Sequence, residues 1–189
     1  AQRPCATGGR GYDAVMSKTI ATLALLCALL PSSARTETLQ EGAAFPAWKL
    51  RDHTGSEVDS SSLRGTPYLL WYYPKAMTPG CTAEGIGLRD RHDEFRALGV
   101  AILGVSFDAP EENARFVAAH GFPFRLLSDD GSLAVLVGAA ESSDQRVPRR
   151  LSYLVGADGR VLRRYDTVTP AEHAADVLAH LRELPAPTP

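Results

Sequence analysis

The apolar residues between positions 48 and 184 fall into two kinds of segment. Uninterrupted apolar runs occur at residues 68–73 and 100–107, and such runs are typical of central strands that are buried on both faces. Pro74 ends the first run, because proline cannot donate a ladder hydrogen bond. Shorter strands are predicted at residues 48–52, 124–127, 151–155 and 160–165.

Helical periodicity separates these strands. Residues 82–98 carry an apolar stripe of Leu88, Phe95 and Leu98, and Gly99 follows as a C-terminal cap. Further helices are predicted at residues 60–63, 110–121, 132–137 and 169–184. Strands and helices alternate first, and a hairpin and a closing helix follow. This order predicts an α/β fold, with a mixed central sheet that is covered by helices on both faces.

The N-terminal segment has a different pattern. Residues 1–15 are rich in Gly, Ala and Arg without periodicity, and we interpret them as a non-native or disordered extension. Residues 16–34 resemble a secretory signal peptide, with a mildly positive start, an apolar stretch and small residues ending at Ala34. The apolar stretch, residues 20–30, is shorter than the roughly 20 residues that a membrane span needs. We therefore predict export to a bacterial periplasm, with residues 35–189 as a single domain.

The bulk composition fits one globular domain. The chain has 189 residues, a net charge of -2 and 44% hydrophobic residues, which is enough chain to bury a core. This charge gives no electrostatic reason to expect a nucleic-acid partner. No cofactor is expected, because the sequence has no glycine-rich dinucleotide or phosphate loop. No metal site is expected either, and His173 and His180 on the last helix are interpreted as solvated surface residues.

Cys81 is the residue that points to chemistry. Of the three cysteines, Cys5 and Cys27 lie in the N-terminal segment, so the predicted domain has one thiol and no internal disulfide. Cys81 follows a buried strand and stands at the start of a helix, where backbone N–H groups favour an anion. This placement favours a reactive thiolate over the inert buried cysteine that is the ordinary alternative.

The segment around Cys81 resembles the active-site motif of the peroxiredoxins. Pro74, Thr78 and Cys81 match its Pro-x-x-x-Thr-x-x-Cys pattern. The longer stretch WYYPKAMTPGCTAEGIGLRD is similar to the PrxQ branch, also called the bacterioferritin comigratory proteins (BCP). The similarity extends over roughly residues 42–184, through GVAILGVSFD, FRLLSDDGSLA and RLSYLVGADGR. It implies a thioredoxin-like fold of the AhpC/TSA type and an antioxidant peroxidase.

The resemblance also implies roles for the three motif residues. Cys81 matches the peroxidatic cysteine, whose thiolate attacks a peroxide oxygen and becomes sulfenic acid. Thr78 matches a threonine whose hydroxyl hydrogen-bonds both sulfur and peroxide. Pro74 matches a proline that packs over the site and limits water. The implied substrates are hydrogen peroxide and organic hydroperoxides.

Two charged residues complete the implied site. Arg150 matches the arginine that favours the thiolate and holds the peroxide oxygens, with Arg149 as the alternative one residue away. Glu84 lies one turn after the cysteine and would help to hold this arginine. Taken singly, these candidates have simpler explanations: Pro74 as a strand end, Thr78 as a helix N-cap, and the charges as surface or helix-terminus residues. Their combination at the family's spacing favours the functional interpretation.

The chain departs from its relatives at one position. Many PrxQ proteins carry a resolving cysteine five residues after the first one, and this chain has Ile86 there. We therefore predict a one-cysteine mechanism with an external reductant, either glutathione or a thioredoxin-like protein. Gly85 is predicted to weaken the helix by about 0.8–1.0 kcal/mol relative to alanine and to let it fray around Cys81. The resemblance implies a monomer or a weak homodimer.

Two other functions compete with the peroxidase hypothesis. A thiol–disulfide reductase of the thioredoxin class would need a Cys-x-x-Cys motif, and here Thr82, Ala83 and Glu84 follow Cys81. A catalytically weak redox sensor or binding protein that forms mixed disulfides with partners is compatible with a lone thiol. Turnover with a supplied thiol separates this sensor from an enzyme.

Overall fold

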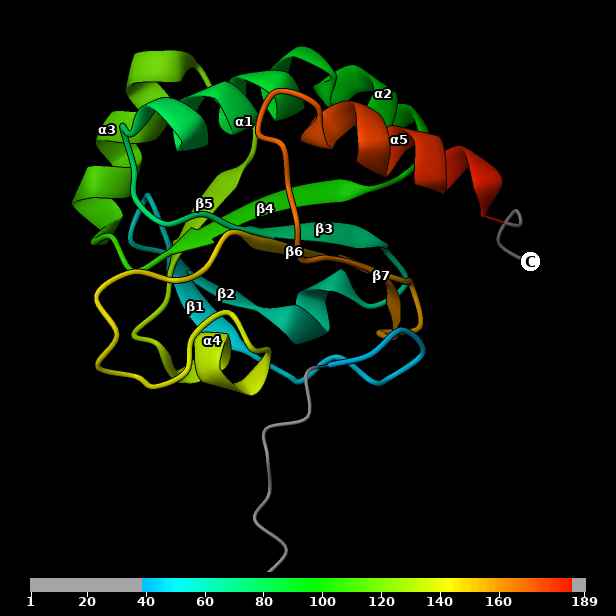
Figure 1. Ribbon diagram of the computed structural model, residues 1–189, viewed down its shortest axis with the longest axis horizontal. Coiled ribbons are helices and arrows are strands. Elements are labelled where there is room, and N and C mark those ends of the chain that lie inside the picture. The colour runs from blue at the N-terminus through cyan, green and yellow to red at the C-terminus, as the bar shows by residue number, and fades with distance from the viewer. Residues whose placement is uncertain (1–38, 185–189) are drawn as a thin grey trace, which may run out of the picture. The chain divides into compact units, whose positions relative to one another are not determined.

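A single mixed sheet organises the computed structural model, which describes residues 39–184 (Figure 1). Its strands lie in the order β2-β1-β5-β4-β3-β6-β7. They are β1 (Lys49–Asp52), β2 (Glu57–Asp59), β3 (Tyr68–Tyr72), β4 (Ala101–Ser106), β5 (Arg125–Ser128), β6 (Leu151–Val155) and β7 (Val161–Tyr165). The pairs β3–β4 and β4–β5 are parallel, and the other pairs are antiparallel. The predicted mixed sheet is thereby confirmed.

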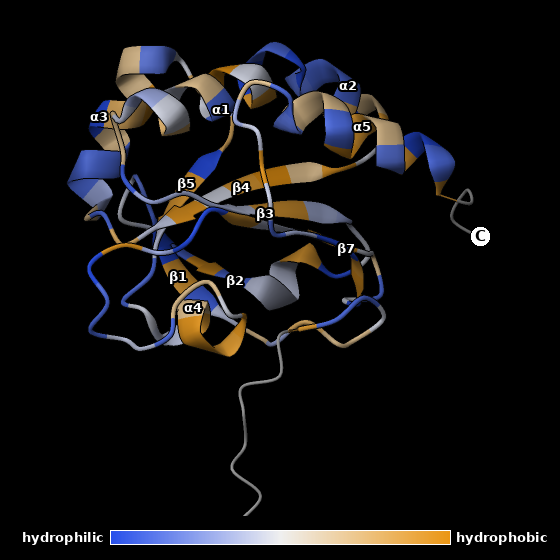
Figure 2. Cartoon of the chain, viewed as in Figure 1, coloured by the Kyte–Doolittle hydropathy of each residue, from blue (hydrophilic) through white to orange (hydrophobic). Residues whose placement is uncertain are grey.

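Helices cover both faces of this sheet. Four of them lie on one face: α1 (Pro79–Asp90), α2 (His92–Ala97), α3 (Pro110–His120) and α5 (His173–Glu183). The short helix α4 (Ser132–Leu136) and the 3-10 helix η1 (Ser60–Leu63) lie on the other. In Figure 2 the central strand β4 is largely hydrophobic and α2 is largely hydrophilic, which fits a buried strand beside a solvated helix.

Strand β3 divides the core into two halves. Its side chains alternate between the faces because successive residues of a strand point in opposite directions. Tyr68 and Tyr72 belong to the cluster on the α4 side, and Trp71 belongs to the cluster beneath α1 and α5. All five residues of β3 are buried, so this strand is central, as its continuous apolar run predicts.

The predicted helix over residues 82–98 is wrong in extent. The structure has α1 from Pro79 to Asp90, then a break, and then α2. Pro79 starts α1 because its fixed φ suits the first helical position. The chain leaves helical geometry at Arg91, with φ -108° and ψ 10°. As a result Phe95 remains fully buried, whereas Leu98, predicted in the same stripe, is 44% exposed.

The N-terminal predictions lie outside the described residues. They comprise the extension at residues 1–15, the export signal at 16–34 and the first residues of the predicted domain, 35–189. Within residues 39–184, no helix has both the length and the apolar character that crossing a membrane requires.

Candidate active site

The register of the sheet brings the site residues to the same end of the strands. Strand β3 ends at Tyr72, and residues 74–78 lead from it into α1. Strand β6 runs antiparallel to β3, with Leu151 opposite Tyr72. Because of this register, Arg150, which precedes β6, lies at the end of the sheet where the chain leaves β3. This arrangement places Arg150 beside the first turn of α1 although 69 positions separate it from Cys81.

Cys81 and Arg150 are in direct contact. The Nη2 group of Arg150 donates a hydrogen bond to the Sγ of Cys81 at 3.3 Å. The thiol is fully buried and lies in the first turn of α1. A guanidinium and a helix N-terminus both favour negative charge on this sulfur. Arg149, the alternative one residue away, is exposed.

Glu84 holds Arg150 from the other side. The Nη1 group of Arg150 donates to the Oε2 of Glu84, and the two residues form an ion pair. The carboxyl is fully buried. Burial raises the pKa of Glu84 to about 7, against the opposing charge of Arg150. The other carboxyl oxygen, Oε1, has no hydrogen-bond partner among the described residues.

His173 belongs to the same cluster, and its interpretation as a solvated surface residue is wrong. Only 1% of it is exposed, and its Nε2 lies 3.0 Å from the Oγ of Ser152. Burial, aided by the charge of Arg150, lowers the pKa of His173 to about 4. The imidazole is therefore neutral at pH 7. A signal was available in the sequence: His173 and Val177 are four residues apart, and Val177 is on the apolar face of α5.

A buried aspartate anchors the loop before Cys81. The backbone N–H of Ala76 donates to the Oδ2 of Asp108 at 2.8 Å, and Lys75 forms an ion pair with Oδ1 of the same carboxylate. Ser106 also donates to Asp108, at 3.0 Å. The loop contains Met77 in left-handed geometry, with φ 64°, which is uncommon for a residue other than glycine. Asp108 thus fixes the path by which the chain enters α1. It ends the similar stretch GVAILGVSFD, but no role was predicted for it from the sequence.

Thr78 and Pro74 flank this loop. The Oγ1 of Thr78 donates to the backbone oxygen of Lys75 at 2.9 Å. Among the described residues it makes no hydrogen bond with Cys81, and its side chain does not cap α1. The expected contact between threonine and sulfur is therefore not made in this structure. Pro74 is half-buried directly after the β3 segment, where both its strand-ending and its shielding roles place it.

Two glycines allow α1 to lie close to its neighbours. A side chain at Gly80 would come within 3.1 Å of the Nη2 of Arg150. A side chain at Gly85 would come within 2.6 Å of a ring carbon of Phe122 and 3.1 Å of one of Trp71. Gly85 is buried in a continuous helix. Its role here is close packing of α1 on the sheet, which the prediction of a frayed helix did not consider.

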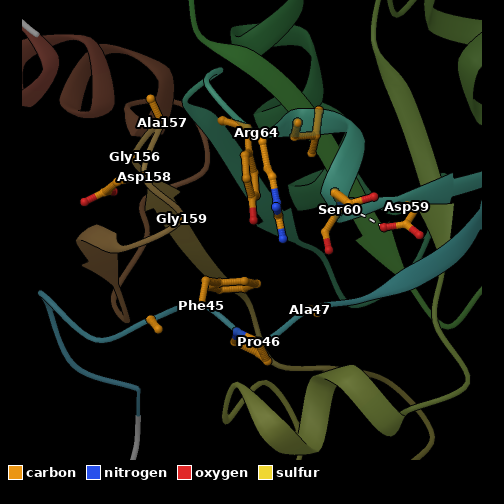
Figure 3. Close-up of a pocket in the computed structure, with 14 residues that line it drawn as sticks. Phe45, Pro46, Ala47, Asp59, Ser60, Arg64, Gly156, Ala157, Asp158 and Gly159 are labelled. Carbon is orange, nitrogen blue, oxygen red and sulfur yellow. Dashed lines mark hydrogen bonds between the residues drawn. The ribbon is translucent and has the colours of Figure 1, made fainter.

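A surface hollow lies near the start of β3, at the other end of the strand from the site (Figure 3). Phe45, Arg64 and the turn from Gly156 to Gly159 line it, together with Tyr68 at the start of β3. Cys81 follows the end of that strand, and none of the predicted site residues lines the hollow. In residues 39–184, no group of three or more His, Cys, Asp or Glu side chains is placed to hold a metal ion.

Comparison with known proteins gives consistent matches. The AhpC/TSA family matches residues 42–164. Peroxiredoxin Bcp of Escherichia coli strain K12 is 37% identical over 151 residues, which cover 77% of this chain and 97% of that protein. Peroxidoxin BcpB from Mycobacterium tuberculosis has a similar structure, with a TM-score of 0.73 at 30% identity, covering 78% of this chain and 99% of that one. The bacterioferritin comigratory protein of Xanthomonas campestris, studied for its alkyl peroxide reduction activity, gives 0.69 at 30% identity, covering 77% and 96%.

Proposed function

Because the chain belongs to the AhpC/TSA family, as a thiol-dependent peroxidase of its BCP/PrxQ branch, we propose that Cys81 alone carries its redox chemistry. The contact between Arg150 and the Sγ of Cys81 is the observation that supports this assignment most directly. Among residues 39–184, Cys81 is the one cysteine, and it is a free thiol.

The first step is a two-electron oxidation of this sulfur. The Cys81 thiolate attacks one peroxide oxygen, an S–O bond forms, and the O–O bond breaks. The second oxygen leaves with the bonding electron pair and takes up a proton, as water from hydrogen peroxide or as an alcohol from an organic hydroperoxide. The alkyl peroxide reduction reported for the Xanthomonas relative supports the second substrate class.

Charge placement is what the other site residues contribute. Arg150 stabilises the attacking thiolate and the oxygen on which negative charge develops, because its guanidinium stays positively charged at physiological pH. Glu84 keeps that guanidinium in position through the ion pair. Pro74 limits water at the sulfur. We propose that the Thr78 hydroxyl, which donates to the Lys75 carbonyl in this structure, donates to the peroxide when substrate binds.

The second step regenerates the thiol with an external reductant. A reductant thiol displaces hydroxide from the Cys81 sulfenic acid, which leaves as water, and a mixed disulfide forms. A second reductant thiol then attacks the reductant sulfur of this mixed disulfide, so that the bond to Cys81 breaks, reduced Cys81 is released and the two reductant sulfurs are joined as a disulfide. Glutathione and a thioredoxin-like protein are the two reductants that we propose. Since Cys81 is fully buried, the first turn of α1 must open to admit either of them.

Turnover by cysteine variants of the full chain tests the one-cysteine mechanism. Hydrogen peroxide consumption is measured with glutathione, and separately with a thioredoxin and its reductase. We expect the double variant Cys5→Ser/Cys27→Ser to keep at least half of the wild-type rate with one of these reductants. Cys81→Ser should lose activity. If the double variant is oxidised normally in one turnover but no longer turns over, Cys5 or Cys27 resolves the sulfenic acid and the proposal is wrong.

We also propose that residues 16–34 direct export to the periplasm and are removed after Ala34. The three-part pattern of these residues supports this proposal. The full chain is expressed in a bacterium with two membranes, and the periplasmic fraction is sequenced from its N-terminus. We expect a mature protein that begins at Arg35. An intact chain confined to the cytoplasm would contradict the proposal, and a charged substitution in the apolar stretch, Leu25→Arg, serves as the control that blocks export.

A further inference from the structure

One buried titratable group has no part in the mechanism above. His173 lies on α5, more than twenty residues beyond Arg150 in sequence, yet it packs against the charged pair at the site. Its Nε2 is 3.8 Å from the Oε1 of Glu84. This is the carboxyl oxygen that has no hydrogen-bond partner among the described residues. A buried acceptor without a partner is costly. Two donors lie near this carboxyl: the imidazole of His173, and the indole of Trp71, which opposes the rise in the pKa of Glu84 and whose Nε1 is likewise buried without a partner among the described residues.

Two neighbours contact this imidazole. The Oγ of buried Ser152 lies 3.0 Å from Nε2, and Ser152 follows Arg150 by two residues on β6. The ring of Tyr165 packs edge-on against the imidazole, with a centroid distance of 5.3 Å. Closing the gap to Glu84 from 3.8 Å to a hydrogen-bond distance of about 2.9 Å needs a movement of only about 1 Å.

We propose that His173 is a positioning residue for the peroxidase reaction. Its single Nε2–H, which lies nearest to Ser152 in this structure, moves to the free oxygen of Glu84 and thereby holds the other oxygen on Arg150. A carboxylate held at one oxygen can rotate about its terminal bond. Held at both, it presents a fixed anion to Arg150, and Arg150 in turn presents a fixed cation to Cys81. The inference rests on the role proposed above for Arg150.

The charged and titratable groups around His173 define what its loss would change. The charge of Arg150 acts on it from the start of β6, and Glu84 lies 3.8 Å away on α1. Tyr165 lies on β7 and is itself hydrogen-bonded at 3.1 Å to His180 on α5. Of these groups, the Glu84 carboxylate is the one that would lose a donor if His173 were replaced. Its charged form would then be less favoured, and it would bind a proton at higher pH.

The test is the pH dependence of Cys81 oxidation in a single turnover. The full chain is mixed with hydrogen peroxide, quenched with an alkylating agent and analysed by mass, from pH 5 to pH 9. For His173→Leu we expect the acid limb of the rate profile to move up by about one pH unit, with recovery of the wild-type rate at pH 9. His173→Gln, whose amide N–H has similar reach, should stay within about twofold of wild type.

Each outcome has one meaning. In a Glu84→Gln background, His173→Leu should produce no further shift, since the carboxylate through which it acts is gone. A His173→Leu rate that falls equally at every pH, or an unchanged profile in a folded protein, would overturn the inference and leave His173 a packing residue. If wild-type Cys81 itself resists oxidation, the proposed function fails first. Circular dichroism at each pH verifies that the variants are folded.

Discussion

Two buried carboxylates, one on each face of the sheet, are used in different ways. Asp129, on the α4 side, accepts hydrogen bonds from the hydroxyl of Tyr72 at 2.9 Å and from the backbone N–H groups of Gly131, Leu133 and Ala134 at 2.8–3.3 Å. Glu84, on the α1 side, has Arg150 at one oxygen and no hydrogen-bond partner in residues 39–184 at the other.

The difference separates a structural anion from a reactive one. Four donors from two segments, β3 and the start of α4, fix Asp129 and, through it, the position of α4. Glu84 is compensated mainly by one cation, and that cation also donates to Cys81. Because Arg150 donates to both residues, a change in the charge of Glu84 changes how strongly Arg150 stabilises the Cys81 thiolate. We therefore expect substitutions on the α4 side to change stability and substitutions around Glu84 to change reactivity.

The largest effect is expected from Asp129→Ala. This change leaves a buried hydroxyl and three backbone donors without their acceptor, and each such loss costs about 1–3 kcal/mol. We expect the free energy of unfolding to fall by about 4 kcal/mol in urea titrations, with the rate of Cys81 oxidation in the folded protein unchanged. Asp130→Ala, which removes one exposed bond to Ser132, is the matched control and should cost about 1 kcal/mol or less.

The next largest effect is expected from Arg150→Met. In contrast to Asp129→Ala, this variant should change the rate of Cys81 oxidation. Losing the donor that stabilises developing charge should lower the single-turnover rate of Cys81 oxidation by about 10²–10³-fold. Arg149→Met, at the exposed neighbouring position, should leave the rate within about twofold. A rate for Arg150→Met within tenfold of wild type would remove the basis for calling Glu84 and Arg150 a reactive pair.

These carboxylates also show how far the sequence alone leads. The proximity of Arg150 to Cys81 could be predicted, because the motif around Cys81 is local and Arg150 directly precedes a recognisable strand. The contact between Glu84 and Arg150 depends on the register between β3 and β6, which periodicity does not determine. The donors to Asp129 depend on turn geometry after β5, again invisible in a pattern of apolar residues. The order of strands and helices is therefore predictable here from periodicity. The partners of buried polar groups are not, and the contact between Glu84 and Arg150 was expected only because of the family resemblance.

The pair formed by Glu84 and His173 should reveal itself in the pH dependence of stability. The folded-state pKa of Glu84 is raised from 4.5 to about 7, so the stability it contributes is present below pH 4.5 and lost as pH rises to about 7. The folded-state pKa of His173 is lowered from 6.5 to about 4, so its contribution is present above pH 6.5 and lost as pH falls. In the wild type the two slopes nearly cancel.

Single variants should therefore uncover slopes of opposite sign. Relative to wild type, Glu84→Gln should gain about 3 kcal/mol of stability between pH 4.5 and pH 7, at about 1.36 kcal/mol per pH unit. His173→Leu should lose a similar amount, relative to wild type, between pH 4 and pH 6.5. Urea titrations across this range measure both. Slopes of the same sign would show that folding does not shift the pKa values of Glu84 and His173 in opposite directions.

The smallest effect is expected at Gly85. Alanine there would bring a methyl group within 2.6 Å of Phe122, and such overpacking costs about 1–3 kcal/mol. Gly87→Ala is the matched control on the same helix, because its nearest neighbour would be 3.9 Å away, and it should stabilise the protein by up to about 1 kcal/mol. If both variants gain stability, α1 is not packed against the sheet as closely as this structure describes.

The most direct test of a single reactive thiol is mass spectrometry of the full chain during titration with hydrogen peroxide. We expect the gain of one oxygen at near-stoichiometric peroxide, located at Cys81. Glutathione should convert this product to a mixed disulfide, and it should be absent in Cys81→Ser. An internal disulfide that joins Cys81 to Cys5 or Cys27 in place of the sulfenic acid would contradict this expectation. So would a Cys81 thiol that is oxidised only at large peroxide excess.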